Sequence, residues 1–206
     1  DNTLGRIWYE MQQGQTRLAG ACKYLVCSSN EVFLNKNQEA RVGDNDAERG
    51  LDHGQILKRT VFIPYRAKKD PRDLKILDPA CGSGHFLLYA FDLLISIYEE
   101  AWHDASSPKS DASGNRLQDD YVDLEDLHAA IPVLVMRHNL YGVDIDQRAA
   151  QIAAFAIWMR GQRAFEEQRV ARSARPLIAK SNVVCAEPMP GELDLRAEFL
   201  AELKPT

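Results

Sequence analysis

The sequence predicts an α/β protein that contains part of a doubly wound parallel sheet, preceded by a helical N-terminal extension. Two observations support this fold class. A short apolar run at residues 74–77 leads into a glycine turn and then into a long apolar segment at 87–98, which is the order strand, turn, helix. Strand and helix patterns then alternate up to residue 186, as expected for one half of such a sheet.

The predicted extension covers residues 1–60, and the predicted sheet-containing domain covers residues 61–206. Within the extension, apolar residues at three- and four-residue spacing predict helix over 1–34. Residues 35–55 are polar and contain several glycines, which is typical of a loop.

The domain is expected to contain three strands, at 74–78, 140–146 and 182–186. Right-handed crossovers would place them in the order third, second, first. Helices are expected at 85–102, 124–138, 147–172 and 192–203.

Details of these helices and of one connection can also be predicted. Pro132 should kink the helix at 124–138 or begin a new one. Residues 104–119 are poor in apolar side chains and are expected to form a mobile excursion. The helix over 147–172 is expected to bury one apolar side, made of Ile152, Phe155, Ala156 and Met159.

The composition argues against several classes of protein. Of the 206 residues 45% are hydrophobic, yet none of the apolar runs approaches the ~18 residues of a membrane span. We therefore expect a cytoplasmic chain without membrane contact, and the start at Asp1 suggests a chain that was processed or cut from a longer protein. The net charge of −5 gives no overall basic field, so a nucleic-acid partner would need a local patch or another domain. The four cysteines lack paired metal spacing, so we expect free thiols and no metal site.

The turn after the first predicted strand, Asp78-Pro79-Ala80-Cys81-Gly82-Ser83-Gly84-His85-Phe86, is the most specific motif in the chain. Glycines without a Cβ let backbone N–H groups come close to a ligand, so Gly82 and Gly84 are typical of a nucleotide-type cradle. An ordinary strand-to-helix turn is the alternative for a lone glycine pair. A dinucleotide fingerprint would carry a third glycine where Leu87 stands, which argues against NAD.

Acidic residues end the other two predicted strands. Asp144 could accept both hydroxyls of a ribose, and Ile145 beside it could pack on an adenine face. Asp146 is expected to cap the following helix. Glu187 could accept the exocyclic amine of an adenine, although a solvated loop acid is the alternative.

Other reactive side chains favour structural roles. His85 begins a helix and lacks a nucleophile motif beside it, and Cys81 is better explained as a small side chain packed in the turn. The basic cluster Arg66, Lys68, Lys69 and Arg72 could contact phosphate, but a solvated face is favoured.

Together, the segments 78–86, 141–146 and 182–190 resemble the cofactor motifs of the DNA amino-methyltransferases that modify adenine N6 in restriction-modification and phage-defence systems. The resemblance implies a Rossmann-like methyltransferase sheet and S-adenosyl-L-methionine as the cofactor. Glu187 stands where the family more often has Asp, and Ile63 where it often has Thr. The cofactor-binding residues that it implies are Asp78, Pro79, Ala80, Cys81, Gly82, Gly84, Phe86, Asp144, Ile145 and Glu187.

The family's catalytic motif, Asn or Asp followed by Pro-Pro and an aromatic residue, has no counterpart in this chain, which contains no Pro-Pro pair. We therefore expect no catalytic residue here, and an S-adenosylmethionine-binding part that does not methylate alone. Contacts with DNA are expected from a C-terminal part outside the chain. In this fold a fourth strand, which the sequence does not contain, pairs beside the first one. The strand at 74–78 would therefore have an open edge, which predicts self-association as a dimer or aggregate.

Two alternatives remain open from the sequence. The same cofactor fold could act on RNA, protein or a small molecule, because fold and cofactor do not fix the substrate. The chain could also be a scaffold subunit without catalytic activity, which a cofactor-binding measurement would distinguish.

Overall fold

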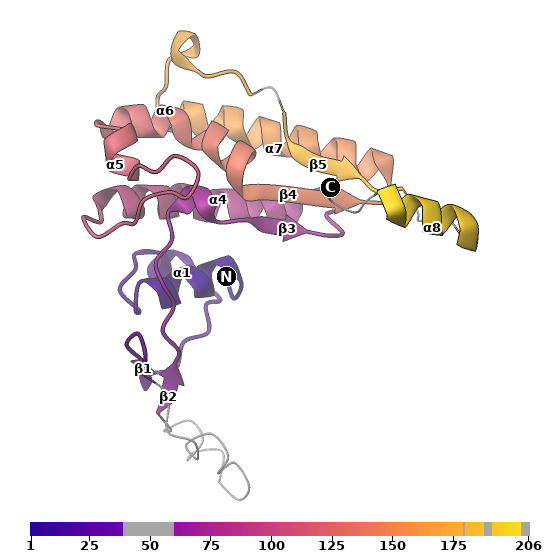
Figure 1. Ribbon diagram of the computed structural model, residues 1–206. Coiled ribbons are helices and arrows are strands. Elements are labelled where there is room, and N and C mark those ends of the chain that lie inside the picture. The colour runs from indigo at the N-terminus through magenta and orange to yellow at the C-terminus, as the bar shows by residue number, and fades with distance from the viewer. Residues whose placement is uncertain (39–59, 179, 188–190, 203–206) are drawn as a thin grey trace, which may run out of the picture.

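The computed structural model describes residues 1–38, 60–178, 180–187 and 191–202. It confirms the α/β class and shows parallel strands in two sheets. The larger sheet contains β3 (Ile76–Asp78), β4 (Leu140–Asp144) and β5 (Asn182–Cys185), in the order β3-β4-β5. This confirms the predicted strand order, with the second strand in the centre (Figure 1).

Three helices form the layer that covers one side of this sheet. They are α4 (His85–His103), α6 (Leu124–Leu134) and α7 (Gln147–Glu167), and all three contact one another. Fully buried side chains of α4 and α6, including Phe91, Leu94, Ile97, Tyr98 and Ile131, form the centre of the core. Burial of such side chains is the main source of folding free energy, at roughly 1.5–3 kcal/mol each.

The other side of the sheet is largely uncovered within the described residues. Strand residues alternate between the two faces, and the register places Leu77 beside Tyr141 and Val143 beside Val184. Leu77 is 59% exposed and Val184 is 54% exposed, whereas Gly142, on the opposite face, is buried. The sheet therefore has one packed face and one open apolar face.

The N-terminal extension packs on α4 through α1 (Leu4–Met11) and α2 (Leu18–Ala21). Leu4, Trp8 and Met11 of α1 are buried in the same core as α4. The predicted helix over 1–34 is wrong beyond residue 21, because β1 (Glu31–Phe33) pairs in parallel with β2 (Val61–Ile63). Strand pairing there overrides the helical spacing. Most of the predicted loop at 35–55 lies outside the described residues, and the boundary near residue 60 stays a prediction.

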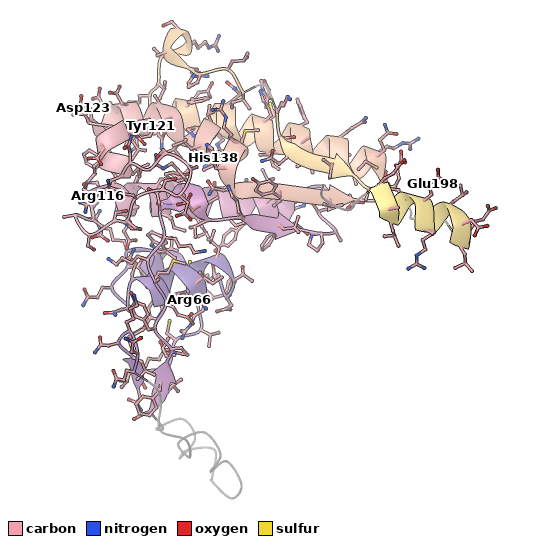
Figure 2. All side chains as sticks on the ribbon, in the orientation of Figure 1. Arg66, Arg116, Tyr121, Asp123, His138 and Glu198 are labelled. Carbon is pink, nitrogen blue, oxygen red and sulfur yellow. The ribbon has the colours of Figure 1, made fainter. Side chains whose placement is uncertain are left out.

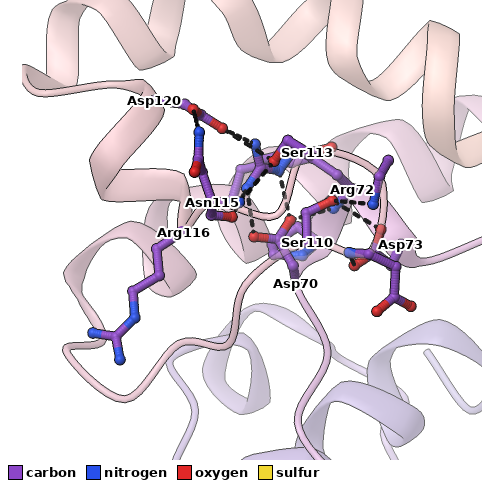
Figure 3. Close-up of polar contacts among 12 residues, drawn as sticks. Asp70, Arg72, Asp73, Ser110, Ser113, Asn115, Arg116 and Asp120 are labelled. Atoms are coloured by element: carbon purple, nitrogen blue, oxygen red, sulfur yellow. Dashed lines mark hydrogen bonds and ion pairs between the residues drawn. The ribbon is translucent and has the colours of Figure 1, made fainter.

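The connection after α4 is hydrogen-bonded rather than a free excursion. Ser107 and Ser110 are buried, and Ser110 Oγ donates to Asp73 Oδ1 at 3.0 Å. Asp73 belongs to the short 3-10 turn η1 (Pro71–Asp73), and the connection ends in α5 (Leu117–Asp120). A segment poor in apolar residues is thus held by polar contacts that its composition does not reveal (Figure 3).

Helix α7 buries a different side from the predicted one. Ile152, Phe155 and Met159 are 55%, 63% and 49% exposed. The buried residues are mostly small, namely Ala150, Ala153, Ile157, Gly161, Ala164 and Phe165. Small residues allow α7 to approach its neighbours closely: a Cβ at Gly161 would lie 3.1 Å from Ile178 Cδ1. The predicted face is wrong because the buried face of α7 is made mostly of small residues, which a search for large apolar residues does not find.

The remaining elements are short or peripheral. Pro132 lies inside α6, and the chain continues into the π-turn η2 (Val135–Asn139) before β4. The 3-10 turn η3 (Arg172–Ala174) follows α7, and α8 (Leu193–Glu202) ends the described chain without a buried residue. Among the described residues, none of the helices is both long enough and apolar enough to span a membrane.

Candidate cofactor-binding site

The ends of β3, β4 and β5 bring the predicted site residues to one edge of the sheet. The strands are parallel, so their carboxyl ends lie at the same edge. Asp78 ends β3, Asp144 ends β4, and Asp144 pairs with Cys185 at the end of β5. The turns that follow these strands therefore surround one region of space (Figure 1).

The glycine turn between β3 and α4 is tied to β4. The backbone N–H of Cys81 donates to Val143 O at 2.9 Å, and that of Gly84 donates to Cys81 O at 2.8 Å. Gly82 and Gly84 have φ angles of 51° and 84°, which side chains with a Cβ rarely adopt. A Cβ at Gly84 would lie 3.2 Å from Ala153 Cα, whereas a Cβ at Gly82 would meet no atom within 4 Å. Gly84 thus allows close packing, and Gly82 faces open space.

The side chain of Asp144 links the glycine turn after β3 to the start of the loop after β4. Its Oδ2 accepts the backbone N–H of Gly82 at 2.7 Å, and its Oδ1 accepts that of Asp146 at 2.9 Å. The Asp146 N–H, followed by that of Gly82, lowers the pKa of the Asp144 carboxyl below its ordinary value. The side chain is therefore a carboxylate at neutral pH, and each oxygen has a lone pair left for a ligand.

Asp146 has the capping role predicted for it. Its Oδ1 accepts the backbone N–H groups of Arg148 at 2.8 Å and of Ala149 at 3.4 Å, at the start of α7. The neighbouring Ile145 is 84% exposed and makes no buried packing contact. The two acids on either side of Ile145 thus have different contacts: Asp144 accepts from the glycine turn, and Asp146 caps α7.

The remaining residues of the first motif differ in exposure. Asp78 Oδ1 accepts the Ala80 N–H at 3.3 Å, and Pro79 and Ala80 are exposed. Cys81 is buried, and burial, followed by the nearby Asp144, raises the pKa of its thiol, which supports packing rather than nucleophilic chemistry. Phe86 is 42% exposed at the start of α4. His85 Nδ1 lies 2.9 Å from Ser83 Oγ in a local hydrogen bond.

The loop after β5 brings Glu187 to the same edge. Ala186 N–H donates to Asp144 O at 2.8 Å, which holds the start of this loop beside β4. Glu187 is exposed, and residues 188–190 lie outside the described part. Cys185 was not among the predicted site residues, and its exposed thiol contacts Ile145 O at 3.7 Å at the same edge.

Gly142 is a second residue that the sequence analysis missed. A Cβ there would lie 2.9 Å from Leu87 Cδ1 and 3.2 Å from Cys81 Sγ. The glycine lets the turn and α4 lie close on β4. The available signal was a glycine inside an otherwise apolar strand, which often marks close approach of another backbone.

The basic cluster at 66–72 is not at this edge. Arg66 Nε donates to Glu10, and Lys68 Nζ donates to Asp104 at 2.6 Å. Arg72 is held by Asp70 and Asp120. Figure 2 shows Arg66 beside the N-terminal extension, away from the strand ends. In the described residues, no group of three or more His, Cys, Asp or Glu side chains is arranged to hold a metal ion.

A parallel α/β sheet with a glycine turn and a carboxylate at one edge defines the class of this protein as a candidate nucleotide-type ligand-binding domain. Residues 66–193 match the family model described as "MmeI, DNA-methyltransferase domain". The chain belongs to this family. The match confirms the resemblance that the motifs indicated.

Individual relatives agree with the family match. The chain is 40% identical over 93 residues, 45% of its length, to an adenine-specific methyltransferase BrxX of Escherichia coli O9:H4 (strain HS). It is 32% identical over 106 residues, 50% of its length, to an adenine-specific methyltransferase PglX of Lacticaseibacillus casei (strain Zhang). A putative type II restriction enzyme and methyltransferase of Methanocaldococcus jannaschii is 34% identical over 96 residues, 46% of this chain. The matches cover only 6–7% of these relatives' length.

Proposed function

We propose that this chain binds S-adenosyl-L-methionine at the carboxyl edge of the β3-β4-β5 sheet and serves a DNA adenine-N6 methyltransferase of the restriction-modification or phage-defence type. The observation that carries the proposal is the contact between Asp144 Oδ2 and the Gly82 N–H. It joins the glycine turn and the strand-end carboxylate, the two parts of a site for a nucleoside-containing ligand.

The residues present fit such a ligand. The open space at Gly82 leaves room where a side chain would intrude. The Asp144 carboxylate would accept the two ribose hydroxyls, and the exposed Ile145 would pack on the adenine ring. Glu187 would accept the adenine amine. The wall of the site beside the methionine part of the cofactor would be formed by the remaining residues of the first motif, namely Asp78, Pro79, Ala80, Cys81, Gly84 and Phe86.

When bound, the cofactor would supply an electrophilic methyl group. The chain would hold the cofactor at this edge, where the glycine turn is hydrogen-bonded to β4. We assign no catalytic residue to this chain, since no Pro-Pro motif occurs in it. The acceptors for the target adenine amine belong to the remainder of a longer enzyme in this proposal.

Isothermal titration calorimetry with S-adenosylmethionine tests the proposal. Asp144→Ala should weaken binding about tenfold or more, because two hydrogen bonds to a charged acceptor are lost. Glu125→Ala removes one exposed acid from α6 and should leave the dissociation constant unchanged. Equal affinity of the Asp144 variant would refute its ribose role, and no binding by the unmodified chain would favour a scaffold function.

A further inference from the structure

The segment that connects α7 to β5 carries an unusual concentration of positive charge. Six cationic and two acidic residues lie between 160 and 180, a balance of +4 in a chain whose overall charge is −5. In Figure 1 this segment rises at the end of α7 that is farther from the glycine turn. A local patch of this kind is what a nucleic-acid partner would require in an acidic chain.

Ion pairs occupy only part of this charge. Arg160 and Arg163 pair with Asp92 and Glu167, and Arg175 lies 3.7 Å from Glu166. Within the described residues, the side chains of Arg137, Arg169, Arg172 and Lys180 make no ion pair and are exposed. Unpaired cations keep their attraction for an external anion.

Two adjoining hollows give this surface its shape. One, of about 460 Å³, is lined by Arg172, by the pair of Arg175 and Glu166, and by Trp158 and Gln162. The other, of about 220 Å³, is lined by Arg137 and Lys180. Leu177 and Ile178 line both hollows, so the cations surround a shared apolar ridge.

We propose that Arg137, Arg172 and Lys180, around the ridge of Leu177 and Ile178, form a binding surface for the phosphate backbone of duplex DNA. Guanidinium groups match phosphate geometry, and Trp158 and Gln162 add the aromatic and amide contacts that accompany such sites. The cluster at 66–72 does not qualify, because acids of the chain already neutralise Arg66, Lys68 and Arg72.

The surface is separate from the proposed cofactor site. Helix α7 has 21 residues and begins at Asp146, beside Asp144. At 1.5 Å per residue the far end of α7 lies about 30 Å from the cofactor edge. Lys180 precedes β5 and is five residues before Cys185, so it lies about 17 Å from that edge. These separations correspond to about five to nine base pairs of duplex, so the contact would be to backbone outside the methylated base. The assignment of DNA, rather than another polyanion, rests on the proposed function.

Fluorescence anisotropy with a labelled duplex of about 30 base pairs, over about 50 to 200 mM NaCl, tests this surface. Arg172→Gln with Lys180→Gln should weaken binding about tenfold at low salt and reduce the salt slope by about 1.8, one phosphate per cation lost. Lys23→Gln with Lys36→Gln removes the same charge from the exposed N-terminal extension and serves as the matched control. The control should stay within about twofold of the unmodified chain.

Three outcomes overturn the proposal. These are an unchanged salt slope in the Arg172 and Lys180 variant, an equal loss in both double variants, and tighter binding of poly-glutamate than of DNA. The last would indicate an acidic protein partner. Cofactor calorimetry separates this proposal from the previous one: the Arg172 and Lys180 variant should bind S-adenosylmethionine normally. If the unmodified chain does not bind S-adenosylmethionine but the Arg172 and Lys180 variant still shows the weaker DNA binding, the cofactor site is rejected and the DNA surface is retained.

Discussion

Two glycines in the turn after β3 occupy very different surroundings, although they stand only two positions apart. A side chain at Gly84 would meet the backbone of Ala153, and a side chain at Gly82 would enter open space. Both glycines were predicted to form a cofactor cradle, but only the structure separates the glycine that allows close packing from the one that faces open space. The reason is that Ala153 lies on α7, far away in sequence.

This difference predicts unequal losses of stability. Gly84→Ala should lower the free energy of unfolding by about 3 kcal/mol, from the left-handed backbone and the contact with Ala153. Gly82→Ala should cost about 1–2 kcal/mol, from the backbone alone. Urea unfolding followed by circular dichroism measures both. Equal losses would show that the close contact with Ala153 does not affect the free energy of unfolding.

At the scale of elements, the hydrophobic pattern correctly predicted the strands of the larger sheet and most helix bounds. The right-handed crossover rule correctly predicted the strand order. The three strands and α4 carry continuous apolar runs between clear turns, so their limits depend on local sequence. The failures concern long-range partners. The pairing of β1 with β2, the small buried face of α7 and the polar contacts of residues 104–116 all depend on residues distant in the chain. The same holds at the sheet edge: the position of Asp144 at the end of β4 was predicted, whereas the approach of Leu87 and Cys81 to Gly142 depends on residues distant in the chain.

Arg72 illustrates how such a long-range contact fixes an element. Its Nε and Nη2 donate to the two oxygens of Asp70, at 2.8 and 2.9 Å, and its Nη1 donates to Asp120 at 2.5 Å (Figure 3). Nη2 also donates to Asn115 O at 2.9 Å. Asp70 is fully buried and Arg72 nearly so, so one guanidinium ties η1 to the connection before α5.

Arg72→Ala should therefore lower the free energy of unfolding by about 3 kcal/mol, because it leaves the buried Asp70 carboxylate without its partner. Arg116→Ala is the matched control, since its exposed side chain reaches only Ala105 O and should change stability by less than about 0.5 kcal/mol. Thermal and urea unfolding would measure both, and similar values for the two variants would contradict the assignment.

The pH dependence offers a second check on the same contact. The Arg72 hydrogen bond, followed by that of Asn115, lowers the pKa of Asp120 below its ordinary value of 3.8. A lowered folded-state pKa gives stability that is present above pH about 4 and is lost as the pH falls through the folded pKa. The unmodified chain should therefore exceed Asp120→Asn in stability at pH 7, and this difference should shrink in acid. A constant difference would argue against the ion pair.

At the scale of the whole molecule, the sheet is open in two ways. In the described chain β3 has only one neighbouring strand, so its outer edge is unpaired. Leu77 of the same strand is 59% exposed on the uncovered face, next to the partly exposed Tyr141 and Val143. An unpaired edge beside an apolar face is a template for pairing with another chain.

We expect this chain to self-associate in solution through β3. Leu77→Lys places a charge on the edge strand and on the open face, and should shift the molecular mass in light scattering toward that of the monomer. Val122→Lys adds the same charge at a side chain that is 77% exposed in the connection before α6, and should not change the mass. A monomeric unmodified chain at high concentration would contradict the expectation. An equal shift in both variants would instead assign the effect to net charge, and would remove β3 as the contact.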